Sequence, residues 1–329
     1  MVMRLPSTVS RPKAAYLQKY DKFLIINADD FGCCKACNEA IMELFEAGKL
    51  FQASIMMNCG ETTDEAAKWA AKHPRYYYAP HLTFTSEWYD RERFGWRPLA
   101  GGASIVDNDG RFYEYEKDFQ ANADQRDVRN EIEAQIRAFY SYGLKTYHAD
   151  NHMGSLYGIN PPAIEKITDA KVFLPKNNFL LKTTLEVLKK YNLAFRFPRN
   201  VLPENVPPDA ELGDIPPIAV DVLAKIYGLQ AKKAGVQVID HLIFPYEIKD
   251  FACYDEFYIA TVERLKDIPD GVTETFFHPA KDGFDLKEMT GNSKQRIWEY
   301  KLLMDDDFWE ELEEEGIKII TYEEFVKHF

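Results

Sequence analysis

Strand-like apolar runs alternate with helix-like patterns along most of this chain, and that alternation limits its fold more than any other feature. FLIINA at 23–28 is followed by a helical pattern at 36–47, and the same order recurs as far as VTETFFH at 272–278. Repeated βα units of this kind favour a mostly parallel sheet with helices packed against it. The expected strands cover 23–28, 52–58, 76–84, 146–150, 193–197, 236–244, 272–278 and 317–321. This number of strands is typical of an irregular (β/α) barrel that resembles a TIM barrel.

We expect a single (β/α)-barrel domain over 1–329, because neither a linker nor an internal repeat interrupts the alternation. Two long loops, at about 86–124 and about 199–217, would lie over the barrel mouth. The first loop is rich in aromatic residues, which form either a ligand platform or packing on the barrel rim. The expected helices cover 36–47, 62–72, 126–141, 161–168, 218–233, 254–266, 291–314 and the residues from 322 onward.

Charge and hydropathy exclude several classes of partner. The formal net charge of −13 argues against nucleic acid, because such binding depends on Lys and Arg neutralising phosphates. No stretch approaches the roughly 20 apolar residues of a membrane span, and the N-terminal segment lacks the apolar core of a secretion signal. We therefore expect a cytoplasmic protein that acts on a small molecule. A homodimer is compatible with the sequence.

The five cysteines do not suggest a disulfide framework. Three of them lie in CCKAC, as Cys33, Cys34 and Cys37, while Cys59 and Cys253 stand alone. An odd number without regular spacing argues against paired disulfides. A structural zinc site usually takes two spaced pairs of ligands, and no second pair follows CCKAC. We expect small buried residues at the start of a helix.

Acidic and imidazole side chains cluster where strands are expected to end. Asp29 and Asp30 follow the first strand, and neighbouring side chains on a strand point in opposite directions, so both cannot be idle surface charges if the strand is buried. His81, His148, His152 and His278 lie in or at the ends of three other strand segments. The C-terminal ends of parallel barrel strands converge on one mouth.

This convergence predicts a metal site. Two imidazoles and one carboxylate can form one face of a coordination shell that suits zinc or a similar divalent ion. A second carboxylate beside a metal-bound water could act as a general base, which would explain the tandem aspartates. Taken alone, His81 or His278 would more often be structural.

The motifs resemble those of the YdjC-like carbohydrate deacetylases. NADDFG, HLTFT, HADNH, FFHP and IKIITYEEF occur in that order over most of the chain. The resemblance implies an irregular (β/α) barrel similar in style to the polysaccharide deacetylases. It implies one divalent ion, zinc or magnesium first and manganese or cobalt next, bound by Asp30, His81 and His152. It also implies Asp29 as the catalytic base and His278 as the acid.

Other residues near these motifs have expected roles as well. Asp150 and His148 share a face with His152 if HADNH is extended, so Asp150 could orient a ligand histidine, and His148 is an alternative ligand to His152. Trp88, Trp96 and Arg97 are candidate contacts to a sugar.

The chain also departs from the family pattern. Met153 and Gly154 follow HADNH where further histidines are common, and Asn151 and Ala280 replace common residues. We expect these changes to affect the substrate rather than the metal.

The expected reaction is hydrolysis of an acetamide on an N-acetylated sugar or short oligosaccharide. Metal-bound water would attack the carbonyl, Asp29 would accept its proton, and His278 would protonate the leaving amine. Two alternatives stay open. One is a metal-independent glycosidase that uses two carboxylates, with Glu274 as the acid. The other is a barrel that binds sugar or metal without catalysis.

Overall fold

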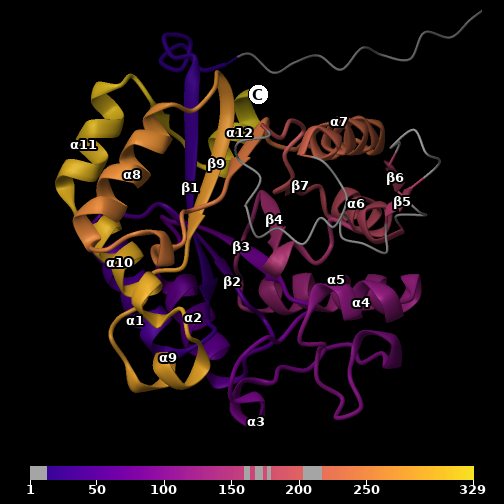
Figure 1. Ribbon diagram of the computed structural model, residues 1–329. Coiled ribbons are helices and arrows are strands. Elements are labelled where there is room, and N and C mark those ends of the chain that lie inside the picture. The colour runs from indigo at the N-terminus through magenta and orange to yellow at the C-terminus, as the bar shows by residue number, and fades with distance from the viewer. Residues whose placement is uncertain (1–12, 159–163, 167–172, 176–178, 203–216) are drawn as a thin grey trace, which may run out of the picture.

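The computed structural model describes residues 13–158, 164–166, 173–175, 179–202 and 217–329 (Figure 1). Its main sheet has the strand order β7-β4-β3-β2-β1-β9-β8, with β10 also paired to β1. All the pairs in this sheet are parallel, as the alternation predicts. The strands are β1 (Lys22–Phe31), β2 (Gln52–Ile55), β3 (Tyr77–Leu82), β4 (His148–Asn151), β7 (Ala194–Phe195), β8 (His241–Ile243), β9 (Gly271–Phe277) and β10 (Lys318–Ile319).

The sheet curls into an irregular (β/α) barrel, which confirms the expected fold class. Phe195 at the end of β7 forms a parallel bridge with Val238, just before β8, so the two outer strands of the order meet. The backbone N–H of Phe195 donates to the Gln237 carbonyl at 2.9 Å. β1 lies in the middle of the order and is buried along nearly its whole length, as the near-continuous apolar run predicts for a strand covered on both faces.

Helices surround the strands (Figure 1). Several long helices pack an apolar stripe inward; α5, for example, buries Val128, Ile132, Ile136 and Phe139 at three- and four-residue spacing. The long helices are α1 (Lys35–Glu46), α2 (Glu61–Lys72), α5 (Gln125–Ser141), α6 (Phe179–Tyr191), α7 (Pro217–Ala234), α8 (Tyr254–Lys266), α10 (Ser293–Met304) and α11 (Asp306–Glu314). The shorter ones are α3 (Arg91–Phe94), α4 (Glu116–Asn122), α9 (Phe284–Met289) and α12 (Tyr322–His328).

Two local predictions were wrong, and one helix was missed. Within the expected helix at 161–168, Ile164–Lys166 forms strand β5, which pairs antiparallel with β6 (Phe173–Pro175). Helix α6 was not predicted. The single helix expected at 291–314 is divided into α10 and α11 at Asp305, whose side chain accepts a hydrogen bond from the Asp307 N–H and so caps the second helix.

The aromatic-rich loop at 86–124 buries several of its rings. Trp88, Phe94 and Trp96 are buried, whereas Tyr89 is 75% exposed. The loop is not wholly irregular, because it contains α3, α4 and a short 3₁₀ helix at Ala103–Ile105. Most of the second expected loop, at about 199–217, lies outside the described residues. Among the described residues, no helix has the length and apolar character that crossing a bilayer requires.

Candidate metal centre and active site

A bulge at the end of β1 places both aspartates at one site. Between Ala28 and Phe31 the pairing of β1 with β2 shifts by one residue, and Asp30 adopts a left-handed backbone conformation with φ 61°. Bulges and such strained residues re-aim side chains near functional sites. The Asp29 and Asp30 carboxylates lie 4.0 Å and 3.4 Å from His81 Nε2. On a regular strand, Asp29 and Asp30 would point to opposite faces of the sheet. The bulge brings both carboxylates to the same site.

Asp30, His81 and His152 form a compact buried group at the ends of β1, β3 and β4. One ligand atom from each lies within 4.8 Å of the other two. Asp30 Oδ1 is 3.4 Å from His81 Nε2 and 3.2 Å from His152 Nδ1. That oxygen is buried and makes no hydrogen bond. A buried carboxylate oxygen that makes no hydrogen bond and faces two imidazole nitrogens fits a divalent cation.

Each of the two histidines in this group has its second ring nitrogen against a carboxylate. His81 Nδ1 is 2.7 Å from Asp150 Oδ1, and His152 Nε2 is 2.8 Å from Glu87 Oε1. Metal-binding imidazoles usually have such a partner, which fixes the ring orientation. Asp150, which was expected to orient a ligand histidine, lies against His81. Glu87 was not predicted, although it follows His81 by only six residues in the same segment.

These carboxylates also change the proton affinity of the rings. Burial alone would lower the pKa of His81, but Asp150 and Asp29 outweigh it and raise the pKa to about 9. For His152, burial is likewise outweighed by Glu87 and Asp30, which raise its pKa well above the usual range. The negative potential around both rings would equally favour a cation.

Arg196, which follows β7, binds Asp29 through two hydrogen bonds. Its Nη1 and Nη2 donate to Asp29 Oδ2 at 2.6 Å and Oδ1 at 2.8 Å. Asn27 Nδ2 adds a third donor to Oδ1 at 2.6 Å. Sequence analysis did not identify Arg196. The Arg196 guanidinium holds the Asp29 carboxylate next to Asp30, His81 and His152, but Asp29 is not one of the three candidate ligands.

The same guanidinium pairs with two further buried carboxylates. Arg196 Nη2 lies 2.9 Å from Asp150 Oδ2, and Nε donates to Glu274 Oε1 at 2.6 Å. Asp29, His81 and Asp150 form a second group whose ligand atoms are close enough for an ion. Because Arg196 already contacts both carboxylates of this second group, the Asp30 group is the better candidate.

Glu274 and His148 lie in the buried interior beside Arg196. Burial raises the pKa of Glu274 to about 7, despite the opposing charge of Arg196, and Tyr322 donates a hydrogen bond to its carboxylate. His148 stacks on the Tyr322 ring with centroids 3.4 Å apart, and burial lowers its pKa. The Asp30 group includes His152 and not His148. Glu274 is fully buried, and its two carboxylate oxygens are bound by Arg196 and Tyr322.

His278 follows β9 and is held by helix α10. Its backbone N–H donates to Glu299 Oε2 at 2.6 Å, and its Nδ1 lies 3.9 Å from the same oxygen. One helical turn earlier, Arg296 Nη2 donates to Asp30 Oδ2 at 2.7 Å. Helix α10 thus connects His278 with the Asp30 group. The His278 side chain is 25% exposed, unlike the buried His81 and His152.

Two of the three candidate sugar contacts, Trp88 and Trp96, lie beside His152. The Trp88 and Trp96 rings are 5.8 Å and 6.3 Å from the His152 ring. Arg97 instead donates to the backbone carbonyls of Asp109 and Gly110 within its own loop. The Arg296 guanidinium, which was not predicted, lies 5.6 Å from the Trp88 ring centroid.

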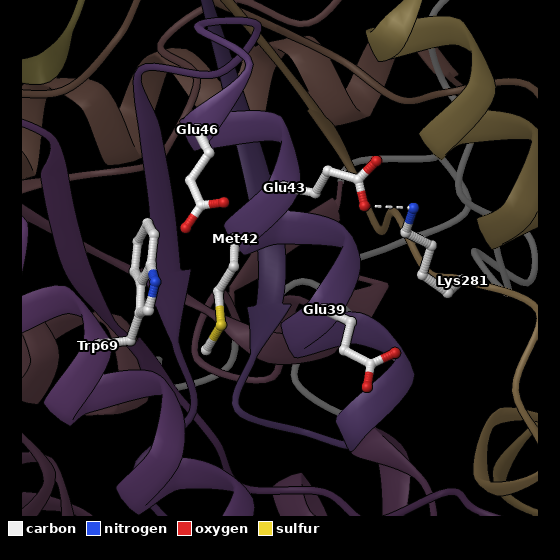
Figure 2. Close-up of a pocket in the computed structure, with 6 residues that line it drawn as sticks. All are labelled: Glu39, Met42, Glu43, Glu46, Trp69 and Lys281. Carbon is white, nitrogen blue, oxygen red and sulfur yellow. Dashed lines mark ion pairs between the residues drawn. The ribbon is translucent and has the colours of Figure 1, made fainter.

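A separate surface pocket lies on the outer side of α1. Figure 2 shows its lining, in which Lys281 forms an ion pair with Glu43. The lining residues are Glu39, Met42, Glu43, Glu46, Trp69 and Lys281. None of them belongs to the Asp30 group or contacts it through a described hydrogen bond, so the pocket is not part of the candidate site.

Comparison with known proteins agrees with the motifs. A family model described as YdjC-like protein matches residues 23–314. A carbohydrate deacetylase from Geobacillus stearothermophilus is 28% identical, over 93% of this chain and 99% of the relative. One from Clostridium beijerinckii (strain ATCC 51743 / NCIMB 8052) is 30% identical, over 57% of this chain and 78% of the relative.

A solved structure shows the same fold. The crystal structure of a putative cellobiose-phosphate cleavage protein from Enterococcus faecalis V583 superposes with a TM-score of 0.68. The two sequences are 24% identical, and the match covers 93% of this chain and 99% of that one.

Proposed function

Since this chain belongs to the YdjC-like protein family, we propose that it is a metal-dependent carbohydrate deacetylase, which hydrolyses the acetamide of an N-acetylated sugar or short oligosaccharide. The observation that carries the proposal is the buried Asp30 Oδ1, which has no hydrogen bond and faces His81 and His152. A site of this composition accepts several divalent ions, among which we propose zinc or magnesium, then manganese or cobalt.

Asp30, His81 and His152 would hold the ion. When bound, a divalent ion polarises an acetyl carbonyl and makes water a stronger nucleophile. Asp150 and Glu87 keep the two imidazoles turned toward the site. Trp88 and Trp96 would border a sugar beside His152.

Asp29 would accept the proton of the attacking water. Arg196 and Asn27 fix its orientation, and each carboxylate oxygen has more than one lone pair, so acceptor capacity remains. His278 would donate a proton to the departing sugar amine. The products are acetate and an amino sugar, and each of these proton transfers is typically worth about 10² to 10⁴ in rate.

The test is acetate release from a panel of N-acetylated mono- and disaccharides by the metal-loaded protein. We expect release that a chelator abolishes and that one of the four metals restores. Asp29→Asn should keep a stoichiometric metal while losing turnover. Bond cleavage between sugars without acetate, in the presence of chelator, would instead indicate a glycosidase, and metal binding without either product would indicate a binding protein.

A cytoplasmic location and a homodimer are also part of the proposal. Cell fractionation and sedimentation velocity would test them.

A further inference from the structure

Three cysteine thiols converge at the start of α1. Cys33, Cys34 and Cys37 are each at most 1% exposed, and their sulfur atoms all lie within 4.8 Å of one another. Cys34 Sγ and Cys37 Sγ are 3.5 Å apart. All five cysteines of the chain lie in its described part, and all are free thiols. The sequence argument against a metal site rested on the lack of a second pair of ligands, but the fold brings together three sulfurs from one short segment.

Positive charge lies on two sides of this thiol cluster. Cys34 is the N-cap residue of α1, so the cluster sits at the end of the helix that carries about half a positive charge. From α10, Arg296 Nη1 lies 3.6 Å from Cys37 Sγ. Hydrogen bonds from Cys33 and Cys34, assisted by the Arg296 charge, hold the pKa of Cys37 well below its usual range. Burial raises the pKa of Cys33, and the pKa of Cys34 is also raised, because its hydrogen bond with Cys37 and burial outweigh the hydrogen bond with Cys33. Cys37 is therefore the thiolate of the cluster, and a metal ion bound to it would displace the protons of the other two thiols.

The donor set selects among metals. Structural zinc is almost always bound by four ligands, whereas this group has three members among the described residues. All three donors are sulfur, and soft thiolate ligands favour Cu(I) among the common ions. A Cu(I) ion held by three thiolates has an excess of negative charge, which Arg296 and the helix N-terminus offset.

We propose that Cys33, Cys34 and Cys37 form a second metal site, specific for a soft monovalent ion, with Cu(I) bound in trigonal coordination by three thiolates. Binding replaces the protons of the thiols and transfers no electron. The site is chemically distinct from the Asp30 group, whose oxygen and nitrogen donors suit harder ions. The proposal does not depend on the proposed deacetylase activity.

The two sites share one side chain. Arg296 contacts Asp30 Oδ2 through Nη2 and Cys37 Sγ through Nη1. The guanidinium therefore lies between the two groups and separates their donor atoms. A soft ion at the cysteines would not need any ligand from the Asp30 group.

The test is anaerobic titration of the full-length, chelator-treated protein with Cu(I), in competition with a chromophoric Cu(I) chelator. We expect one ion per chain, a thiolate-to-copper charge-transfer absorption, and an X-ray absorption spectrum with sulfur-only coordination. Cys34→Ser and Cys37→Ser should each weaken Cu(I) binding by more than about tenfold. Loss of a residue that only supports a metal ligand already weakens binding by about 10–100-fold, and these changes remove a ligand itself. Cys253→Ser, a change at an exposed cysteine, should bind like wild type.

Two results would overturn the proposal, and neither depends on a variant that might misfold. One is nitrogen or oxygen in the copper shell of the wild-type protein. The other is failure of the wild-type protein to compete with the chelator at equimolar copper. His81→Ala provides a further control, because it removes a member of the Asp30 group and should leave the Cu(I) absorption intact.

Discussion

The Asp30 group and the Arg196 network contain similar residues but differ in how their charges are satisfied. In the network, one buried guanidinium contacts Asp29, Asp150 and Glu274 at 2.6–2.9 Å. In the Asp30 group, Arg296 contacts one carboxylate oxygen, and the other, Oδ1, makes no hydrogen bond. Asp150 Oδ2 in the network also makes no hydrogen bond, but it faces the Arg196 guanidinium at 2.9 Å, whereas Asp30 Oδ1 faces two imidazole nitrogens at 3.2 and 3.4 Å. A carboxylate held by a guanidinium supports the scaffold, whereas an oxygen that faces two imidazoles marks the place for a metal ion.

The largest effect is expected from Arg196→Met. It leaves three buried carboxylates without their cation, and loss of one partner of a buried ion pair typically costs about 3–5 kcal/mol. Urea denaturation would measure the free energy of unfolding. Arg199→Met is the matched control, because Arg199 pairs with Asp240 and its side chain is 57% exposed, so it should change stability by less than about 1 kcal/mol. Equal losses in the two variants would contradict the supporting role of the network.

Glu274→Gln is expected to change the pH dependence of stability. The pKa of Glu274 in the folded protein is about 7, above the ordinary value of 4.5. Between these two pH values, Glu274 holds a proton in the folded state but not in the unfolded state. The free energy of unfolding of the wild type therefore falls as the pH rises from 4.5 to 7. Glutamine does not titrate. The variant should therefore gain stability relative to wild type between pH 5 and 8, by on the order of 3 kcal/mol.

The measurement is urea denaturation of both proteins at several pH values. Glu310→Gln, at an exposed position of α11, should follow wild type throughout. A difference between Glu274→Gln and wild type that is independent of pH would show that Glu274 does not titrate in this range.

Glu87→Gln probes the Asp30 group rather than the network. Glutamine keeps the size of the side chain but removes the carboxylate that orients His152. Loss of such a partner typically weakens metal binding by about 10–100-fold, and we expect little change in stability. Metal affinity, measured by calorimetric titration, is the readout. Glu92→Gln, at an exposed position in the same loop, is the control, and equal affinities in all three proteins would refute the assigned contact.

The smallest effect is expected from Arg97→Ala. Its guanidinium is bound to carbonyls of its own loop, and substitutions at such surface positions usually change stability by at most about 0.5 kcal/mol. The Michaelis constant for the best acetylated sugar should stay within about twofold. A larger rise would restore Arg97 as a substrate contact.

Much of the sheet was predictable because its strands are short, apolar and regularly separated. All eight expected strands overlap an observed strand of the main sheet. The pattern for α6 was also present, since Leu181, Leu185 and Leu188 are buried at helical spacing, but it was not recognised. The strand β5 could not be read from its own residues, because its structure depends on pairing with β6.

The site was predictable only where it depended on motifs. Asp30, His81 and His152 lie together as expected, because the strand ends converge. Arg196, Arg296 and Glu87 were missed for a common reason. A charged residue in an ordinary segment is usually exposed, and only partners distant in the chain decide that it is buried, like Arg196 and Arg296, or partly buried, like Glu87.

The most direct test of the account is a crystal structure with zinc, using anomalous scattering to locate the ion. We predict a strong peak bonded to Asp30, His81 Nε2 and His152 Nδ1 at about 2.0–2.2 Å, with Asp29 still held by Arg196. A peak bonded instead to Asp29 and Asp150, or no peak at either group in zinc-saturated crystals, would contradict the account.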